Sequence, residues 1–297
     1  MRVVLVHNPS AGVRGCTAEE LVGTLRAEGV TPVYLPSKEA EPDALLGETA
    51  DLVAVAGGDG TVARIATILP GRGIPFTILP MGTMNNIATT LGIDGSVRDL
   101  VRGWRTGRCR PFDVWVAEGS WGRRRFVEGV GLGALAKTLC DVEDDAPKRR
   151  RGRDGRVALH RALAAAEPSR PGLVVDGSEL GGEWLLVEML NIAYAGPGLQ
   201  LAPDADPGDG LLDLMCLAPG RRSEALDWLE VAEGRGPAPA SVRRCRSVRF
   251  DWEGGPLRID DAEPDPAAGR SGRVEITLDP AALTVLLPDE AWRKDSR

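Results

Sequence analysis

The first hundred residues alternate between short apolar runs and segments with helical spacing. Residues 2–6, 52–56 and 74–79 are apolar runs with the length and composition of buried parallel strands. Residues 62–69 repeat apolar side chains at the spacing of one helical face. Because parallel strands must be joined by a crossover, usually a helix, this order predicts an α/β N-terminal domain with a Rossmann-like parallel sheet.

Capping residues and glycines mark further elements of this half. Thr17 and Glu20 form a capping-box pattern that opens a helix, and Gly29 ends it. We also expect a weak strand at 32–35 and helices at 85–91 and 97–104.

After about Arg110 the sequence changes to apolar runs separated by Gly, Pro and Asp turns, which predicts a β-rich antiparallel sandwich with helical insertions. We expect strands at 183–193, 210–217, 242–252, 256–260, 273–278 and 283–287, and helices at 132–140, 156–166 and 223–232. The predicted domains are 1–112 and 113–297, and a return of the last ~20 residues to the first domain is left open.

Composition excludes several classes of protein. The net charge of -7 argues against wholesale nucleic-acid binding, which requires a basic face. The five cysteines are scattered, without zinc or disulfide spacing, which favours a reducing cytoplasm. The N-terminus does not resemble a signal peptide, and no apolar run approaches the ~20 residues of a membrane-spanning helix. Any membrane contact is therefore expected to be peripheral.

The motif Gly57-Gly58-Asp59-Gly60-Thr61 follows the apolar run at 52–56. It has two interpretations. One is a tight turn, in which glycine supplies positive φ and Asp caps the next helix. The other is a phosphate cradle at the start of a helix near Thr61, where backbone N–H groups point at the anion. Its position at the carboxyl end of a strand in an α/β domain favours a ligand site.

Two more polar turns follow apolar runs in the same way. Asn8 begins the turn that runs to Gly12, and Gly82, Thr83 and Asn85 lie in the turn after 74–79. Three such turns would line one rim of the sheet. Their shared position favours a nucleotide-binding crevice over the interpretation as three unrelated turns.

These motifs resemble the diacylglycerol kinase catalytic family in its small bacterial form, over nearly the whole chain. Residues 57–61 resemble its nucleotide loop, which NAD kinases share. Residues 80–86 resemble its Pro-Leu-Gly-Thr-x-Asn-Asp block, with Met81 for Leu and Asn86 for Asp. NAD kinases carry a different block there, so the pair of motifs separates the two groups.

The resemblance implies an ATP- and Mg2+-dependent lipid kinase with its active site between the two domains. Asp59 is expected close to the metal of the nucleotide. The implied nucleotide-binding residues are Asn8, Gly57, Gly58, Asp59, Gly60, Thr61, Gly82, Thr83 and Asn85.

The family also has a structural magnesium site in its second half. The resemblance places it here at the side chain of Asp209 and the main chains of Asp206 and Leu211. An Asp-rich turn offers the hard oxygen ligands that magnesium takes. The alternative is a plain Asp-Gly hairpin.

The family's Asp-Gly-Glu segment, whose acidic residue accepts the lipid hydroxyl proton, is matched here by Asp261-Ala262-Glu263. The resemblance implies Glu263 as the base and Asp261 as its neighbour, with the reverse assignment open. Asp260 offers a second register. If the family's glycine uses positive φ, Ala262 would be strained and the loop must differ. A plain solvated acidic loop is the alternative.

Two other segments carry weaker signals. Residues 129–133 are Gly-Val-Gly-Leu-Gly after Glu128, where the family has Asn. We interpret them as a close-packed turn before a helix and assign them no chemistry. The basic run at 148–156 is a weak candidate for contact with anionic lipid headgroups.

Two rival functions remain open. One is a soluble small-molecule kinase such as an NAD kinase, and the other is a non-catalytic lipid or nucleotide binder. The binder is kept open by four departures from the family pattern, at Met84, Asn86, Glu128 and Ala262. The sequence does not identify the lipid, and it leaves a homodimer open.

Overall fold

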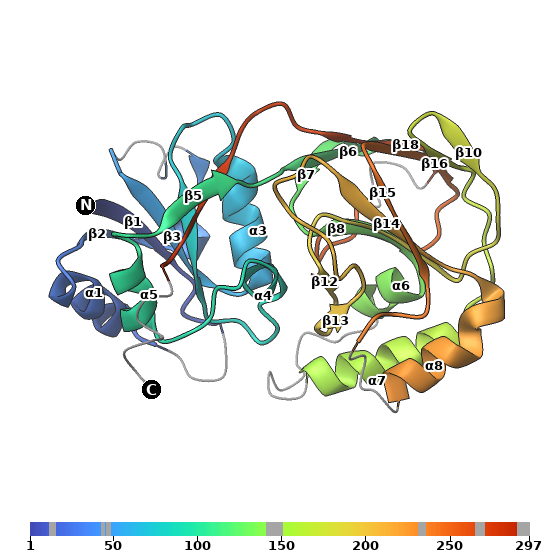
Figure 1. Ribbon diagram of the computed structural model, residues 1–297, viewed down its shortest axis with the longest axis horizontal. Helices are drawn as coiled ribbons and strands as arrows, with labels where there is room; N and C mark the ends of the chain where they lie inside the picture. Colours follow the sequence, from blue (N-terminus) through green and yellow to red (C-terminus); the bar gives the residue numbers. More distant parts are fainter. Residues whose placement is uncertain are drawn as a thin grey trace. The chain divides into compact units, whose positions relative to one another are not determined.

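The structure is a computed structural model that describes residues 1–11, 16–42, 45, 49–140, 151–230, 236–264 and 271–289. The chain divides into two compact units (Figure 1). The first comprises Met1–Phe112 together with Ala281–Arg297, and the second comprises Asp113–Pro280. The chain therefore leaves the first unit after Phe112 and re-enters it at Ala281.

The first unit contains one six-stranded sheet, which confirms the predicted parallel α/β fold. Its central pairs are parallel, and only the last strand is antiparallel to its neighbour. Apolar side chains fill β1 and β3, which are buried on both faces. The order across the sheet is β2 (Thr31–Pro36), β1 (Arg2–His7), β3 (Leu52–Gly57), β4 (Phe76–Pro80), β19 (Thr284–Leu287) and β5 (Arg108–Pro111).

The helices of this unit begin where capping residues place them. The predicted capping box is confirmed: Thr17 Oγ1 accepts a hydrogen bond from the Glu20 N–H at 3.2 Å, and Glu20 Oε2 accepts one from the Thr17 N–H at 2.8 Å. The described elements are α1 (Ala18–Ala27), the 3-10 turn η1 (Ser37–Glu39), α3 (Asp59–Ile68), α4 (Asn86–Thr90) and α5 (Val97–Gly103).

Helix α3 begins at Asp59, three residues before the predicted start at Val62. The reason is that Gly58 is extended and acts as the N-cap, and its carbonyl accepts hydrogen bonds from the N–H groups of Thr61 and Val62, both at 3.0 Å. Asp59, Gly60 and Thr61 therefore form the first helical turn rather than a loop ahead of it.

The strand register brings the predicted polar turns to one edge of the sheet. His7 lies opposite Ala56, and Gly57 lies opposite Pro80. Because β1, β3 and β4 are neighbouring parallel strands, the turns that follow them emerge side by side.

The second unit contains two larger antiparallel sheets, as predicted, and a short hairpin of β12 (Tyr194–Ala195) and β13 (Leu199–Gln200). The six-stranded sheet has the order β10 (Ser178–Leu180), β9 (Leu173–Val175), β16 (Ser247–Trp252), β18 (Gly272–Leu278), β6 (Trp115–Gly119) and β7 (Gly122–Phe126). The five-stranded sheet has the order β15 (Ser241–Cys245), β14 (Leu212–Leu217), β11 (Leu186–Leu190), β8 (Gly129–Gly133) and β17 (Leu257–Ile259).

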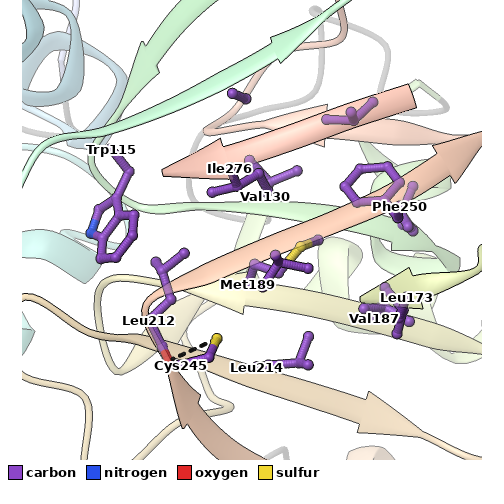
Figure 2. Close-up of a cluster of buried hydrophobic side chains, with 14 of the residues drawn as sticks. Trp115, Val130, Leu173, Val187, Met189, Leu212, Leu214, Cys245, Phe250 and Ile276 are labelled. Atoms are coloured by element: carbon purple, nitrogen blue, oxygen red, sulfur yellow. Dashed lines mark hydrogen bonds between the residues drawn. The ribbon is translucent and has the colours of Figure 1, made fainter. Parts of the chain in front are cut away.

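The five-stranded sheet is the middle of three layers. On one face, Val187 and Met189 of β11 join the sandwich core shown in Figure 2. On the other face, Leu186 and Leu190 of the same strand pack in a cluster with the helices. This alternation follows from the two-residue period of a strand. The helices are α6 (Ala134–Cys140), α7 (Arg151–Ala164) and α8 (Arg222–Glu230), which follows the 3-10 turn η2 (Pro219–Arg221).

Three sequence predictions for this unit are wrong in detail. Residues 242–252 form two strands in different sheets, because the chain crosses at Arg246, where Asp176 Oδ1 accepts hydrogen bonds from the N–H groups of Arg246 (2.8 Å) and Ser247 (2.9 Å). Residues 129–133 form strand β8 instead of a turn, so α6 begins only at Ala134. The helix predicted at 156–166 spans Arg151–Ala164.

Within the described residues, no helix is long and apolar enough to cross a membrane.

Candidate functional site

The turns after β3 and β4 contact each other through glycine backbone. A Cβ atom added to Gly82 would lie 2.5 Å from the Cα atom of Gly58, closer than real Cβ contacts allow. The Met81 N–H donates a hydrogen bond to the Gly57 carbonyl at 2.9 Å. Glycine is therefore required at 82 because the backbones of the two turns touch.

Asn8 links the turn after β1 to the start of α3. Its Nδ2 donates to Thr61 Oγ1 at 3.0 Å, and its Oδ1 accepts from the Ser10 N–H at 3.1 Å. A Cβ atom on Gly57 would lie 2.8 Å from the Cβ of Thr61, so this glycine makes room for the threonine. A hydroxyl that accepts one bond still has its own hydrogen to donate, so Thr61 retains a donor suited to an anion.

The turn after β4 is closed by Asn85. Its Oδ1 accepts a hydrogen bond from the Gly82 N–H at 2.8 Å, and its Nδ2 donates to the Gly82 carbonyl at 3.1 Å. Asn85 has φ of 56° and ψ of 44°, a left-handed conformation that asparagine tolerates better than most residues. The side chain thus fixes the turn and leads the chain into α4.

Asp59 has a structural partner that its sequence position did not indicate. Its Oδ1 accepts a hydrogen bond from the Ile87 N–H at 3.0 Å, in the first turn of α4. Asp59 therefore ties the start of α3 to the start of α4. Its expected place near the metal of a nucleotide stays a prediction.

Together, the three turns place the predicted nucleotide-binding residues on one rim of the first unit. The positive end of the ten-residue helix α3 begins at this rim, where the helix dipole favours an anion. Gly60 and Thr83 are exposed there, and Gly12 lies outside the described residues. The arrangement is suited to hold phosphate groups by backbone N–H groups, an amide and a hydroxyl.

The acidic turn around Asp209 belongs to the second unit. Asp209 Oδ1 accepts a hydrogen bond from the Leu211 N–H at 2.9 Å, and the Asp206 carbonyl accepts from the N–H groups of Gly208 (2.7 Å) and Asp209 (3.3 Å). The Gly210 N–H donates to Asp113 Oδ2 at 2.7 Å, which fixes the turn beside β6. The predicted magnesium ligands therefore lie in one turn.

Arg244 brings a positive charge to this acidic turn. Its Nη1 lies 3.8 Å from Asp209 Oδ2, its Nε lies 3.8 Å from Asp213 Oδ1, and its Nη2 donates to the Asp204 carbonyl. Burial raises the pKa of Asp213 to about 6, and the nearby carboxylates of Asp209 and Asp204 add to the shift, while Arg244 opposes it. The turn thus already has a cationic partner from the chain.

The donor set of this turn fits magnesium in its chemistry. Carboxylate and carbonyl oxygens are the ligands that this ion takes. Within the described ranges, no group of three or more His, Cys, Asp or Glu side chains is arranged to hold a metal. Main-chain oxygens such as those of Asp206 and Leu211 must therefore complete any site built on Asp209.

The segment after β17 forms a tight turn. The Ile259 N–H donates to the Ala262 carbonyl at 2.8 Å, and the Ala262 N–H donates to the Ile259 carbonyl at 3.2 Å. Among the described non-glycine residues, positive φ occurs at Asn85, Asp176 and Asp260, with a φ of 50° at Asp260. The left-handed residue of this turn is therefore Asp260, and the strain expected at Ala262 does not arise.

Asp260, which the sequence offered only as an alternative register, is a structural anchor. Its buried Oδ1 accepts hydrogen bonds from the N–H groups of Glu128 (2.8 Å), Val127 (3.2 Å) and Gly129 (3.3 Å). Burial raises the pKa of Asp260 to about 6, although these N–H groups favour the charged form. An Asp after a short apolar run does not by itself reveal such partners more than a hundred residues away.

The predicted catalytic carboxylates follow this anchor. Asp261 and Glu263 are both exposed, and the Glu263 carbonyl accepts a hydrogen bond from Arg124 Nη1 at 3.2 Å. The Asp260 side chain, by contrast, is engaged by backbone N–H groups. Of the basic run at 148–156, residues 148–150 lie outside the described residues.

Comparison with known proteins covers both units. Residues 2–117 match the family model described as a diacylglycerol kinase catalytic domain. Residues 131–287 match the model described as a YegS C-terminal NAD kinase beta sandwich-like domain.

Relatives of similar length were found among curated proteins. A diacylglycerol kinase of Mycobacterium tuberculosis is 28% identical over 311 residues, which covers 97% of this chain and 95% of the relative. A probable lipid kinase YegS-like of Klebsiella pneumoniae is 29% identical over 282 residues, with 91% of each chain covered.

Solved structures show the same fold. A putative diacylglycerol kinase from Bacillus anthracis superposes with a TM-score of 0.73 at 19% identity, over 98% of this chain and 97% of that one. An NAD kinase from Archaeoglobus fulgidus in complex with ATP superposes with a TM-score of 0.52 at 13% identity, over 99% of this chain and 96% of that one.

We expect Asp260→Asn to remove a pH-dependent loss of stability. The pKa of Asp260 rises from 3.8 to about 6 on folding, so its contribution is fully present below about pH 4 and is lost as the pH rises through about 6. Relative to the variant, the free energy of unfolding of the wild type should fall by about 2–3 kcal/mol between about pH 4 and about pH 7. Urea unfolding followed across this range measures the difference.

The comparison carries its own control. Asp213, whose pKa is also raised to about 6, is present in both proteins, so its contribution cancels. A difference between the two proteins that does not change with pH would contradict the assignment of Asp260.

Proposed function

Because this chain belongs to the diacylglycerol kinase family, we propose that it is an ATP- and magnesium-dependent lipid kinase that transfers the γ-phosphate of ATP to a hydroxyl group of a diacylglycerol-like lipid. The observation that carries the proposal is the contact between Gly58 and Gly82. It joins two glycine turns at the carboxyl edge of a parallel sheet, within the region that matches the catalytic-domain model.

The first unit would hold the nucleotide. Phosphoryl transfer depends mainly on positioning the phosphates and stabilising their charge. Backbone N–H groups at the start of α3 would meet the phosphates, and the Thr61 hydroxyl, oriented by Asn8, would donate a further hydrogen bond. Gly82 and Asn85 would form the opposite wall, since their mutual hydrogen bonds keep that turn in place.

The second unit would supply the base. A general base must reach the proton that it removes from the attacking hydroxyl. Glu263 is our first choice and Asp261 the alternative, because both are exposed residues of the segment anchored by Asp260. Asp260 itself serves the fold of the turn.

Magnesium would be held by the Asp209 side chain and the main-chain oxygens of Asp206 and Leu211. A bound divalent cation supplies fixed positive charge that cross-links an acidic turn. Arg244 contributes positive charge at the same turn, so it would share Asp209 with the ion or release it.

The proposed acceptor is a lipid, so the protein would act peripherally at a membrane surface. The basic run at 148–156 stays a candidate for contact with anionic headgroups.

A direct test of the reaction uses γ-labelled ATP, magnesium, a panel of hydroxylated lipids and NAD. We expect label in one lipid. Glu263→Gln should lower the rate by about 10²–10⁴-fold, the usual contribution of a general base, and Asp261→Asn should lower it less. Glu253→Gln, at an exposed carboxylate of the same unit, is the matched control and should retain full activity.

Other outcomes would decide against this function. Label in NAD alone would support a soluble small-molecule kinase. ATP binding without transfer to any acceptor would support a non-catalytic binder.

ATP binding should depend on the contact between the two glycine turns. In Gly82→Ala, the new Cβ would lie 2.5 Å from Gly58 Cα, so the turns must separate. Overpacking of this kind costs about 1–3 kcal/mol, and we expect ATP affinity to fall by about tenfold or more in calorimetry. Gly23→Ala on α1, with nothing within 4 Å of the new Cβ, should bind ATP like the wild type. Equal affinity in both variants would place the nucleotide elsewhere.

Magnesium should stabilise the second unit through Asp209. Ligands that bind the folded state raise the melting temperature by mass action. We expect added Mg2+ to raise the Tm of the wild type and of Asp227→Asn, an exposed control on α8, but not that of Asp209→Asn. If Mg2+ leaves the wild-type Tm unchanged, the acidic turn is held by Arg244 without a metal.

A further inference from the structure

The second unit buries an ion pair that reaches across an intervening strand. Glu188 of β11 and Arg258 of β17 are 0% and 2% exposed. Arg258 Nη2 lies 2.5 Å from Glu188 Oε2, and Arg258 Nε lies 3.4 Å from Glu188 Oε1. Strand β8 runs between the two strands, and Gly131 of β8 lies in register with both residues.

Gly131 leaves the opening through which the two side chains meet. A Cβ atom on Gly131 would lie 2.2 Å from Glu188 Oε1 and 2.5 Å from its Cδ. Any other residue would therefore push the Glu188 carboxylate away from Arg258. This contact gives a physical reason for one glycine of the Gly-Val-Gly-Leu-Gly run.

Arg258 also holds the turn that follows it. Its Nη1 donates a hydrogen bond to the Asp260 carbonyl at 3.0 Å, and its charge attracts that of Asp261. The other side of the turn is fixed by the N–H groups that donate to Asp260 Oδ1 and by the Asp260 N–H, which donates to the Gly129 carbonyl at 2.8 Å. The guanidinium group thus connects the sheet interior to the start of the exposed acidic segment.

A buried ion pair is a costly way to stabilise a sheet, because the desolvation of both charges offsets much of their attraction. Apolar residues of similar volume would serve the packing as well. The charge allows a contact that an apolar residue could not make. Arg258 is the buried cation that contacts the backbone of the turn carrying Asp261 and Glu263.

We propose that Arg258, fixed by Glu188 through the opening at Gly131, is a positioning residue that sets the turn at 259–262 and thereby the Asp261 and Glu263 carboxylates. The inference rests on the proposed function, in which one of these carboxylates is the base. Glu188 and Gly131 act only through Arg258, and none of the three touches the substrate.

The first experiment compares Glu188→Gln with the wild type. The variant keeps the shape of the side chain but removes the charge that orients Arg258. We expect kcat to fall by about tenfold, whereas the KM for ATP and the calorimetric affinity for ATP change less than about twofold, because the first unit is untouched. Leu163→Ala, a core truncation on α7, is the control for lost stability and should keep kcat when folded.

A second experiment tests the opening itself. Gly131→Ala should lower kcat because its Cβ displaces Glu188. In a Glu188→Ala background, the displaced carboxylate is absent, so Gly131→Ala should cause no further loss. Such non-additivity is expected only when two residues act on the same contact.

Amide hydrogen exchange measures the stability of the turn independently of catalytic activity. The amides of Asp260 and Ala262 both donate hydrogen bonds within this structure, and they should exchange faster in Glu188→Gln but not in Leu163→Ala. This readout separates the inference from the proposed function. A wild type without phosphoryl transfer would reject the function, whereas the exchange result would still test the positioning.

Two results would overturn the proposal. One is a Glu188→Gln protein whose kcat and amide exchange equal those of the wild type. The other is an equal loss from Gly131→Ala with and without the Glu188 side chain.

Discussion

Close approach to the backbone of a glycine is the constraint on which both units depend. In the first unit, Gly58 and Gly82 bring two turns together at the end of the parallel sheet. In the second, Gly131 lets a carboxylate cross a strand to reach an arginine. A side chain at either point would separate groups that must be adjacent. Glycine lowers the intrinsic stability of strands and helices, so its use here reflects the geometry of the sites.

Buried charged residues lie in and next to the five-stranded sheet. Glu188 and Arg258 are the middle residues of β11 and β17, and Asp260 directly follows β17, in a unit whose sandwich core is apolar. Each has partners: backbone N–H groups for Asp260, and each other for Glu188 and Arg258. Ionic groups in a dry interior persist only when they are hydrogen-bonded in this way. The same bonds fix the exposed turn that carries Glu263.

The negative charges of the acidic turn around Asp209 are compensated differently. Asp209 is partly solvated, Asp213 is buried, and Arg244 reaches both from the edge strand β15. Because Arg244 lies opposite Asp213 in the register of β14 and β15, the guanidinium is anchored by the sheet and extends over the turn. An arginine and a divalent cation satisfy the same kind of oxygen atoms, so Arg244 already supplies positive charge of the kind that a metal at this turn would provide.

The sequence by itself determined the alternation of strands and helices in the first unit, the change from parallel to antiparallel pairing and the family, because these follow from local periodicity and from motifs of a few residues. Only the tertiary structure decided that residues 242–252 divide between two sheets, that Asp260 takes the left-handed conformation in place of Ala262, and that Gly131 has a partner in Glu188. Those features depend on contacts between distant residues, such as Glu188 and Arg258, which are 70 positions apart. Local sequence patterns do not reveal such partners, since the free energy of each contact depends on both residues of the pair.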